Sequence, residues 1–438
     1  IESHFIFSSF MNIQYVIKKK TFQLIFSSTE KADKPKSPSE RSTARTPTPV
    51  TTTTTSTTTV IPLYKQKPLL ICQLVSPDRY PPAALRNLVK TQEVPSSAVC
   101  DYILLDLPLS LNFTYTESSY DFLDNNATGH QLLFSVDLNW ANSVQSTRVL
   151  MSKSFLNSLD NANNRLSRQK ICGLGIIKDI YSTVTWQQRE PLLKMAYNRF
   201  NSIIVSLGVY RDDIKNFFAF QPDATFKPTK YHDYLSLLNR VDGLSIVIIL
   251  TITDEDILQV VPSSSWNRSC LPQESQPTMN EAVSAILSIA NPKVNYTLTV
   301  SLRLDKFDSS VDPLFGIFTL FEYDTPSHES FFFEPRCREE IFARYHRGEN
   351  IVYLEDAYCA FAASAMNPSA SVTFETPRTV RDKMRETYRM IGYSKTDTHV
   401  VGWTVYNVTN SLASPECGGY HNRINTIREI IDENKEIR

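Results

Sequence analysis

Residues 69–74 read Leu-Leu-Ile-Cys-Gln-Leu and residues 102–107 read Tyr-Ile-Leu-Leu-Asp-Leu, two short and almost continuous apolar runs. Runs of this kind are typical of parallel β-strands, because such strands are buried on both faces of their sheet. Similar runs recur along the chain, so that eight strands are predicted. They are Leu69–Leu74, Tyr102–Leu107, Leu132–Leu138, Ile171–Ile177, Ile203–Val209, Leu244–Ile252, Thr297–Leu304 and Val400–Tyr406.

Helix signals lie between these runs. Thr278 and Glu281 have the spacing of a capping box, and Thr376 precedes Pro377, a residue favoured in the first helical turn. Alternating strands and helices predict an α/β fold. Eight strands in one apparent domain favour a closed (β/α)8 barrel, a TIM barrel, over an open sheet. An irregular insert is expected near the seventh βα unit, at about residues 305–370.

Two segments that precede the barrel differ from it in composition. Residues 1–29 include an apolar stretch that is shorter than the roughly 20 residues of a membrane span and lacks the order of a signal peptide. The chain opens at Ile1, so we expect its true start to be missing. Residues 30–62 are rich in Thr, Pro and Ser and predict a disordered linker, either an O-glycosylated mucin-like stalk or an unmodified one. The barrel domain is expected over residues 63–438, and no membrane span is clear.

The composition argues against several classes of partner. Lys and Arg number 45 against 46 Asp and Glu, which gives a net charge of -1 and no electrostatic support for nucleic-acid binding. The seven His residues show no HExxH motif, and the chain of only 11 Gly contains no phosphate-binding loop. We therefore expect neither a metal nor a cofactor.

Cysteines and glycosylation sequons indicate an oxidising environment. The seven cysteines are dispersed without a CxxC motif, and Asn-x-Ser/Thr triplets occur five times, one of them at the predicted strand end Asn407. This combination favours a secreted, extracellular glycoprotein. An odd number of cysteines leaves one thiol free, and Cys172, within an apolar strand, is the candidate. The glycosylation candidates are Asn112, Asn126, Asn267 and Asn295.

Several segments resemble glycoside hydrolase family 18, the chitinases and chitinase-like proteins. The resemblance is clearest in the run that begins Ser371-Val-Thr-Phe-Glu-Thr-Pro, the strand His399-Val-Val-Gly-Trp-Thr-Val-Tyr, and the segment Cys417-Gly-Gly-Tyr. Their order and spacing agree with the family over about residues 68–435. The Thr-rich leader makes the chain similar to divergent, secreted members of the family from ticks.

The resemblance also extends to the first half of the chain. His130-Gln-Leu-Leu-Phe-Ser-Val-Asp resembles the third strand of the family, and Val241-Asp-Gly-Leu-Ser resembles the start of the sixth. The family pairs cysteines on its first two strands, which implies a disulfide between Cys72 and Cys100. The other disulfide candidates are Cys337 with Cys359, and Cys270 with Cys417 or with a cysteine of the insert.

The fourth strand of a family 18 hydrolase carries the pattern Asp-x-x-Asp-x-Asp-x-Glu. The Glu protonates the glycosidic oxygen, and the neighbouring Asp holds the acetamide group of the substrate as the nucleophile. Here the four positions are Cys172, Gly175, Ile177 and Asp179, so that only the last is acidic. Ile177 cannot hold the acetamide nucleophile, and Asp179 is one methylene shorter than the Glu of the pattern. The sequence therefore predicts a protein that is not an enzyme. The residual candidate for a general acid is Asp179, which is otherwise a surface carboxylate beyond a strand end.

Aromatic residues could still bind a sugar without an acid. The resemblance implies an aromatic floor on the eighth strand, at Tyr406 or Trp403, and Trp140 could line the barrel mouth. The alternative for the two strand residues is core packing. Three hypotheses follow: a non-catalytic glycoprotein that binds a chitin-like amino-sugar polymer or a protein partner, a weak hydrolase that uses Asp179, and a structural or antigenic scaffold without a sugar site.

Overall fold

The structure is a computed structural model in which the described residues all belong to the unit Leu63–Arg438. The predictions for residues 1–29 and 30–62 lie outside the described residues. The described residues are 68–74, 94–109, 117–136, 143–166, 168–177, 186–220, 228–250, 266–267, 278–301, 305–308, 351–354, 358–363, 370–393, 399–406 and 422–436.

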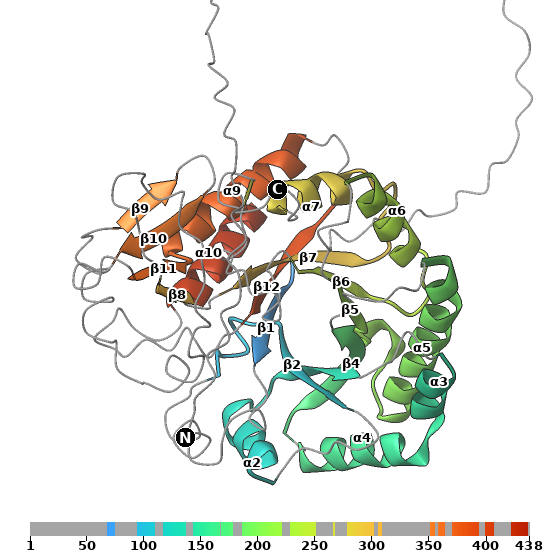
Figure 1. The fold of residues 1–438 in the computed structure, drawn as a ribbon. Coiled ribbons are helices and arrows are strands. Elements are labelled where there is room, and N and C mark those ends of the chain that lie inside the picture. Colours follow the sequence, from blue (N-terminus) through green and yellow to red (C-terminus); the bar gives the residue numbers. More distant parts are fainter. Residues whose placement is uncertain are drawn as a thin grey trace, which may run out of the picture. The chain divides into compact units, whose positions relative to one another are not determined.

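Within this part of the chain, eight parallel strands form a closed barrel with helices around it (Figure 1). The order is β1-β12-β7-β6-β5-β4-β3-β2, so that the first strand pairs with the last. This confirms the predicted (β/α)8 fold. The strands are β1 (Leu70–Leu74), β2 (Tyr102–Leu109), β3 (Gln131–Val136), β4 (Lys170–Ile177), β5 (Phe217–Phe220), β6 (Ile246–Ile249), β7 (Asn295–Ser301) and β12 (Val401–Tyr406).

The helices outside the barrel begin with the predicted caps where those caps are described. Thr278 and Glu281 form both hydrogen bonds of a capping box, and the backbone N–H of Thr379 donates to Thr376 Oγ1 at 3.0 Å. No helix in the described ranges is long and apolar enough to span a bilayer. The helices are α2 (Glu117–Asn126), α3 (Ser143–Met151), α4 (Lys153–Arg165), α5 (Trp186–Ser206), α6 (Pro228–Leu238), α7 (Met279–Leu287), α9 (Pro377–Tyr393) and α10 (Asn422–Glu436).

The fifth barrel strand does not lie where the apolar pattern placed it. The strand predicted at Ile203–Val209 was wrong, because these residues form the end of α5 and the turn that follows it. Phe200 and Ile204 are buried one helical turn apart, and Gly208, with a φ of 86°, follows the helix end. The fifth strand is β5, a run of only four residues.

An insert follows the seventh barrel strand, as predicted, and its described residues form a small sheet. The four strands are antiparallel and have the order β8-β11-β10-β9. They are β8 (Asp305–Asp308), β9 (Ile351–Leu354), β10 (Cys359–Ala363) and β11 (Ala370–Phe374), and α9 begins three residues after β11.

Successive side chains of each barrel strand point alternately out of and into the barrel, and this separates two apolar cores. Side chains that point outward pack against the helices in one continuous cluster, which includes Ile103, Phe134 and Trp403. Side chains that point inward form a smaller group, the inner cluster. Its members are Ile71, Tyr102, Leu104, Leu133, Cys172, Phe217, Ala219, Ile246, Ile248, Leu250 and Tyr406, with Leu69 and Ile177 packed against them.

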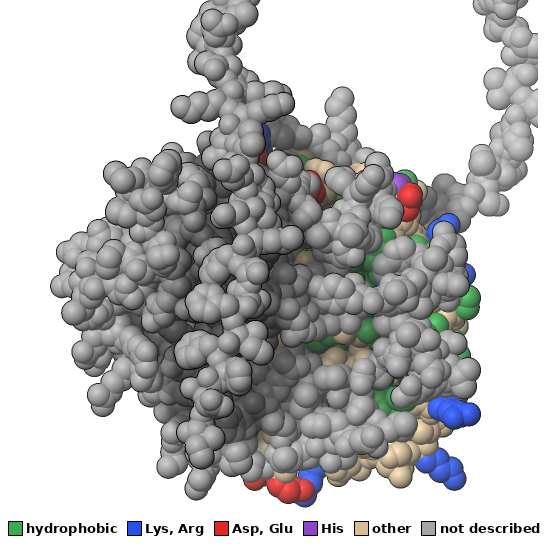
Figure 2. Space-filling model, in the orientation of Figure 1, with side chains coloured by type: hydrophobic (Ala, Val, Ile, Leu, Met, Phe, Trp, Pro, Cys, Tyr) green, Lys and Arg blue, Asp and Glu red, His purple; other side chains and the backbone are tan. Residues whose placement is uncertain are grey.

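The charged side chains visible among the described residues lie toward the rim of the face shown in Figure 2. Basic and acidic groups both occur there, and the chain as a whole carries a net charge of -1.

A buried ion pair lies at the junction between the insert and α9. The carboxylate of Glu375 pairs with Lys383 Nζ, and each side chain is only 1% exposed. The carboxylate also accepts a hydrogen bond of 2.6 Å from Thr379 Oγ1. Burial lowers the pKa of Lys383, and the Glu375 carboxylate opposes this effect. Removal of either charge alone would leave the other buried without its partner, at a cost of roughly 3–5 kcal/mol.

Gly175 on β4 provides a test of the packing inside the barrel. A Cβ atom at this position would overlap the backbone and the ring of Phe217 on β5. We expect Gly175→Ala to lower the free energy of unfolding by about 2 kcal/mol or more, measured in urea. Gly392 is the control, because a Cβ atom there meets nothing within 4 Å. Equal stability of the Gly175→Ala and Gly392→Ala variants would contradict this account of the packing.

Candidate functional site

The candidate site is the barrel interior toward the carboxyl ends of the strands, where TIM barrels place their sites. The fourth strand of the barrel is β4, as the sequence predicted, and it carries three of the four positions of the hydrolase pattern. Cys172 belongs to the inner cluster, Ile177 packs against it, and a side chain at Gly175 would meet Phe217 of the same cluster. These three interior positions are therefore uncharged. Asp179 lies outside the described residues.

The side chains next to β4 form an apolar wall. Ala219 of β5 is the register partner of Ile177, and Ile248 of β6 is the partner of Ala219. Ala219, Ile248 and Leu250 are almost fully buried. A carboxylate placed against this wall would lose its hydration without gaining a hydrogen-bond donor from these residues, which is unfavourable.

Other strands contribute polar groups to the interior. The Thr297 and Thr404 hydroxyls form a hydrogen bond of 2.7 Å between β7 and β12, and Thr299 Oγ1 donates to Ile249 O at 3.1 Å. Gln73 of β1 is also buried. On β3, Ser135 Oγ is buried without a hydrogen-bond partner among the described atoms. The interior thus combines an apolar wall with hydroxyl and amide groups.

The sequence prediction overlooked most of these polar residues. The alternation of Thr297, Leu298, Thr299 and Val300 on β7 was the available signal, because a period of two gives one polar face. Their pairing with Thr404 depends on strand register and could not be inferred from the sequence.

The two aromatic candidates on β12 point in opposite directions. Tyr406 belongs to the inner cluster and is 7% exposed. Trp403 lies on the outer face of the barrel, fully buried, and its indole N–H donates to Tyr388 Oη of α9 at 3.2 Å. Core packing therefore accounts for Trp403, and Tyr406 remains the candidate for sugar stacking. Trp140 lies outside the described residues.

The disulfide between Cys72 and Cys100 is present, as the family resemblance implied. Cys172 is a buried free thiol, as predicted from the odd number of cysteines. Cys359 is the first residue of β10, but its side chain is not among those described. The candidates Cys270, Cys337 and Cys417 also lie outside the described residues, so their pairings remain predictions.

The glycosylation candidates have different surroundings. Asn126 is the last residue of α2, and Asn267 and Asn295 are partly exposed. In the Asn295 sequon, Thr297 is fully buried in the barrel, so packing alone explains this threonine. Asn112 and Asn407 lie outside the described residues. Within the described ranges, no group of three or more His, Cys, Asp or Glu residues could hold a metal ion.

No family model and no curated protein matches the chain. Solved structures do match it. An immunomodulatory active chitinase from Trichuris suis superposes with a TM-score of 0.56 at 13% identity, over 83% of this chain and 100% of that one. Human YKL-39, described as a pseudo-chitinase with retained chitooligosaccharide binding, gives a TM-score of 0.52 at 11% identity, over 83% and 100% of the two chains.

A mutant of a class V chitinase from Nicotiana tobaccum, in complex with NAG4, gives a TM-score of 0.51 at 10% identity. The match covers 84% of this chain and 99% of that chain. At such low identity the likeness shows the fold, which is a chitinase-like (β/α)8 barrel, in agreement with the sequence resemblance. The likeness to tick proteins remains a prediction.

Cys172 should be chemically inert in the folded protein. Burial raises the pKa of its thiol to about 12, so that about one thiol in 10,000 is ionised at pH 8. Native protein treated with iodoacetamide at pH 8 should therefore leave Cys172 unmodified in peptide mass spectrometry, and unfolded protein should be labelled there. Because the thiolate is the reactive form, labelling of the native protein should rise with pH. Native labelling at the rate of the unfolded chain would contradict the buried placement.

Proposed function

We propose that this protein is a non-catalytic, chitinase-like protein that acts by binding an amino-sugar oligosaccharide. The observation that carries the proposal is the uncharged interior of β4. Gly175 and Ile177 occupy positions where the family pattern has carboxylates, and both positions face the inner cluster. An isoleucine can neither orient nor stabilise the acetamide group that acts as nucleophile in substrate-assisted hydrolysis.

A weak hydrolase that uses Asp179 is disfavoured by the same observation. A general acid speeds a reaction by roughly 100- to 10,000-fold, and only when it is held within hydrogen-bond reach of the leaving oxygen. Two positions before Asp179, the chain carries Ile177 where the family pattern has an aspartate, so the pattern's own partner carboxylate is missing there.

Sugar binding without hydrolysis is supported by Tyr406 and by the polar groups of the interior. A tyrosine ring can stack on the apolar face of a pyranose, and neighbouring hydroxyl groups can hydrogen-bond to the sugar. The threonines of β7 and β12 lie on the same side of the barrel as Tyr406. Human YKL-39 is described as a pseudo-chitinase that retains chitooligosaccharide binding. This supports the idea that a barrel of this kind can bind a sugar without hydrolysing it.

The second candidate is a structural or antigenic scaffold, or one that binds a protein partner. The apolar wall of Ile177, Ala219 and Ile248 favours it, since a closely packed interior leaves few groups for a sugar.

We also propose an extracellular location, with N-glycans on sequon asparagines. The Cys72–Cys100 disulfide supports this location, because disulfides persist in oxidising compartments. The Thr- and Pro-rich composition of residues 30–62 supports a mucin-like stalk.

A paired assay on the full chain tests the proposed function. Isothermal titration calorimetry with chitohexaose should detect binding, while fluorogenic chito-oligosaccharides should show no turnover. Tyr406→Leu should weaken binding about tenfold through loss of the stacking contact. Tyr102→Leu is the matched control, since Tyr102 belongs to the same inner cluster but pairs with Ile71 near the amino ends of the strands.

Three outcomes distinguish the hypotheses. Turnover that Asp179→Asn abolishes would overturn the non-catalytic assignment. Absence of both binding and turnover would favour the scaffold. Equal loss of affinity in the Tyr406→Leu and Tyr102→Leu variants would assign the effect to general destabilisation rather than to stacking.

A further inference from the structure

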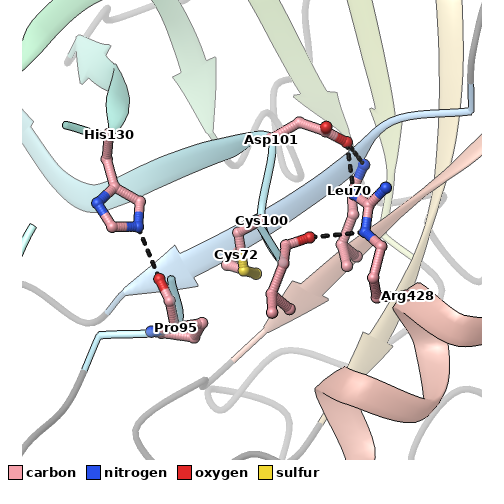
Figure 3. Close-up of a disulfide and its surroundings, with 8 residues drawn as sticks. Leu70, Cys72, Pro95, Cys100, Asp101, His130 and Arg428 are labelled. Carbon is pink, nitrogen blue, oxygen red and sulfur yellow. Dashed lines mark hydrogen bonds and ion pairs between the residues drawn. A yellow bond between two sulfur atoms is a disulfide. The ribbon is translucent and has the colours of Figure 1, made fainter. Parts of the chain in front are cut away.

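Residues 94–101, which precede β2, are held by three separate parts of the chain (Figure 3). We refer to them as the 94–101 segment. At one end of the segment, the His130 ring donates through Nε2 to Pro95 O at 2.6 Å, and His130 lies directly before β3. At the other end, Cys100 is bonded to Cys72 of β1. Both cysteines are almost fully buried.

The third contact comes from α10, the C-terminal helix. Arg428 Nε donates to Val99 O at 2.8 Å, and its Nη2 donates to Asp101 Oδ2 at 2.7 Å. The same carboxylate oxygen accepts from the Leu70 backbone N–H at 2.8 Å. The Arg428 side chain is only 9% exposed. One guanidinium therefore connects α10 to the start of both β1 and β2.

In the sequence, the bridged Cys100 stands between the two residues that accept from Arg428. Val99, Cys100 and Asp101 are consecutive, so the bridged cysteine separates the carbonyl group and the carboxylate that Arg428 contacts. The backbone N–H groups of Val99 and Cys100 both donate to Ser96 O, which closes a turn immediately before the bridge. The covalent link to β1 thus adds to the backbone hydrogen bond from Asp101 N–H to Leu70 O, which also holds this end of the segment against β1.

The rest of the α10 interface relies mainly on apolar packing. Ile424, Ile427, Ile430 and Ile431 are buried in the outer cluster, and Arg423 Nη1 donates to Glu375 O at 3.2 Å. If the 94–101 segment moves, Arg428 loses charge-assisted hydrogen bonds that hold a largely buried cation, which is a costly loss.

We propose that the Cys72–Cys100 disulfide is a covalent latch for α10, which acts through Arg428. A dithiol reductant supplies two electrons and two protons, the S–S bond breaks into two thiols, and the reductant becomes a disulfide. The 94–101 segment then loses its covalent link to β1, and the two acceptors of Arg428, Val99 O and the Asp101 carboxylate, are held by hydrogen bonds alone. As a result, α10 opens locally and exposes its isoleucine face, while the opposite side of the barrel stays folded.

Hydrogen exchange of the full chain tests the latch. The variant Cys72→Ala/Cys100→Ala removes this bridge alone, and amides of α10 should exchange roughly tenfold faster or more, with those of α5 changed less than about twofold. Arg428→Gln in the oxidised protein should give a similar acceleration in α10. Arg423→Gln is the matched control on the same helix, because its contact is to Glu375 rather than to the 94–101 segment.

The decisive measurement combines the cysteine and arginine substitutions in one variant. If the bridge acts through Arg428, adding Arg428→Gln to the double alanine variant should accelerate exchange less than the product of the separate factors. The proposal would be overturned if the combined variant accelerated exchange by the full product of the separate factors. It would also be overturned if Arg423→Gln accelerated exchange in α10 as much as Arg428→Gln does. If the cysteine variant does not fold, wild-type protein is compared before and after dithiothreitol, with alkylation to identify the opened cysteines. Protection lost throughout the barrel, or unchanged in α10, would overturn the latch as well.

Discussion

Parallel pairing between the first and last strands of the barrel is the constraint on which the other features depend. Ring closure places Leu70 of β1 opposite Trp403 of β12 and Ile71 opposite Thr404. Because side chains alternate along a strand, a register shift of one residue would bring Trp403 inside and Thr404 outside. The closed ring therefore decides which residues can meet a ligand and which can pack against the helices. The Arg428 contacts and the Cys72–Cys100 bridge lie beside the strand β1 at which the ring closes.

The sequence was sufficient for most of the barrel, because buried parallel strands are conspicuous as apolar runs. It failed at β5, where Phe217–Phe220 is shorter than the apolar end of the preceding helix. In the site, the spacing on β4 identified Gly175 and Ile177, since it depends only on alternation within one strand. The hydrogen bond between Thr297 and Thr404 spans 107 residues and depends on tertiary pairing. No pattern along the chain reports such a contact.

The absence of carboxylates at Gly175 and Ile177 of β4 also bears on the energetics of the barrel. Catalytic carboxylates must be held in a partly dehydrated site, and this opposes folding. Ile177 adds apolar contact to the inner cluster instead. The polar groups that remain are mostly neutral hydroxyls, and two of them satisfy each other across β7 and β12. At these described positions the interior favours stability, and the groups they offer a ligand are an aromatic ring and neutral hydrogen-bonding side chains.

The ion pair between Glu375 and Lys383 has a consequence for how the sequence can diverge. Both side chains are buried, so a substitution that removes one charge leaves the other in an apolar environment. A lineage that replaces the pair must therefore pass through a less stable protein, unless both codons change together. Whether a substitution is tolerated at Glu375 consequently depends on the residue at position 383, and the reverse holds as well. This dependence applies even in a chain whose identity with the chitinase structures it resembles is only 11–13%.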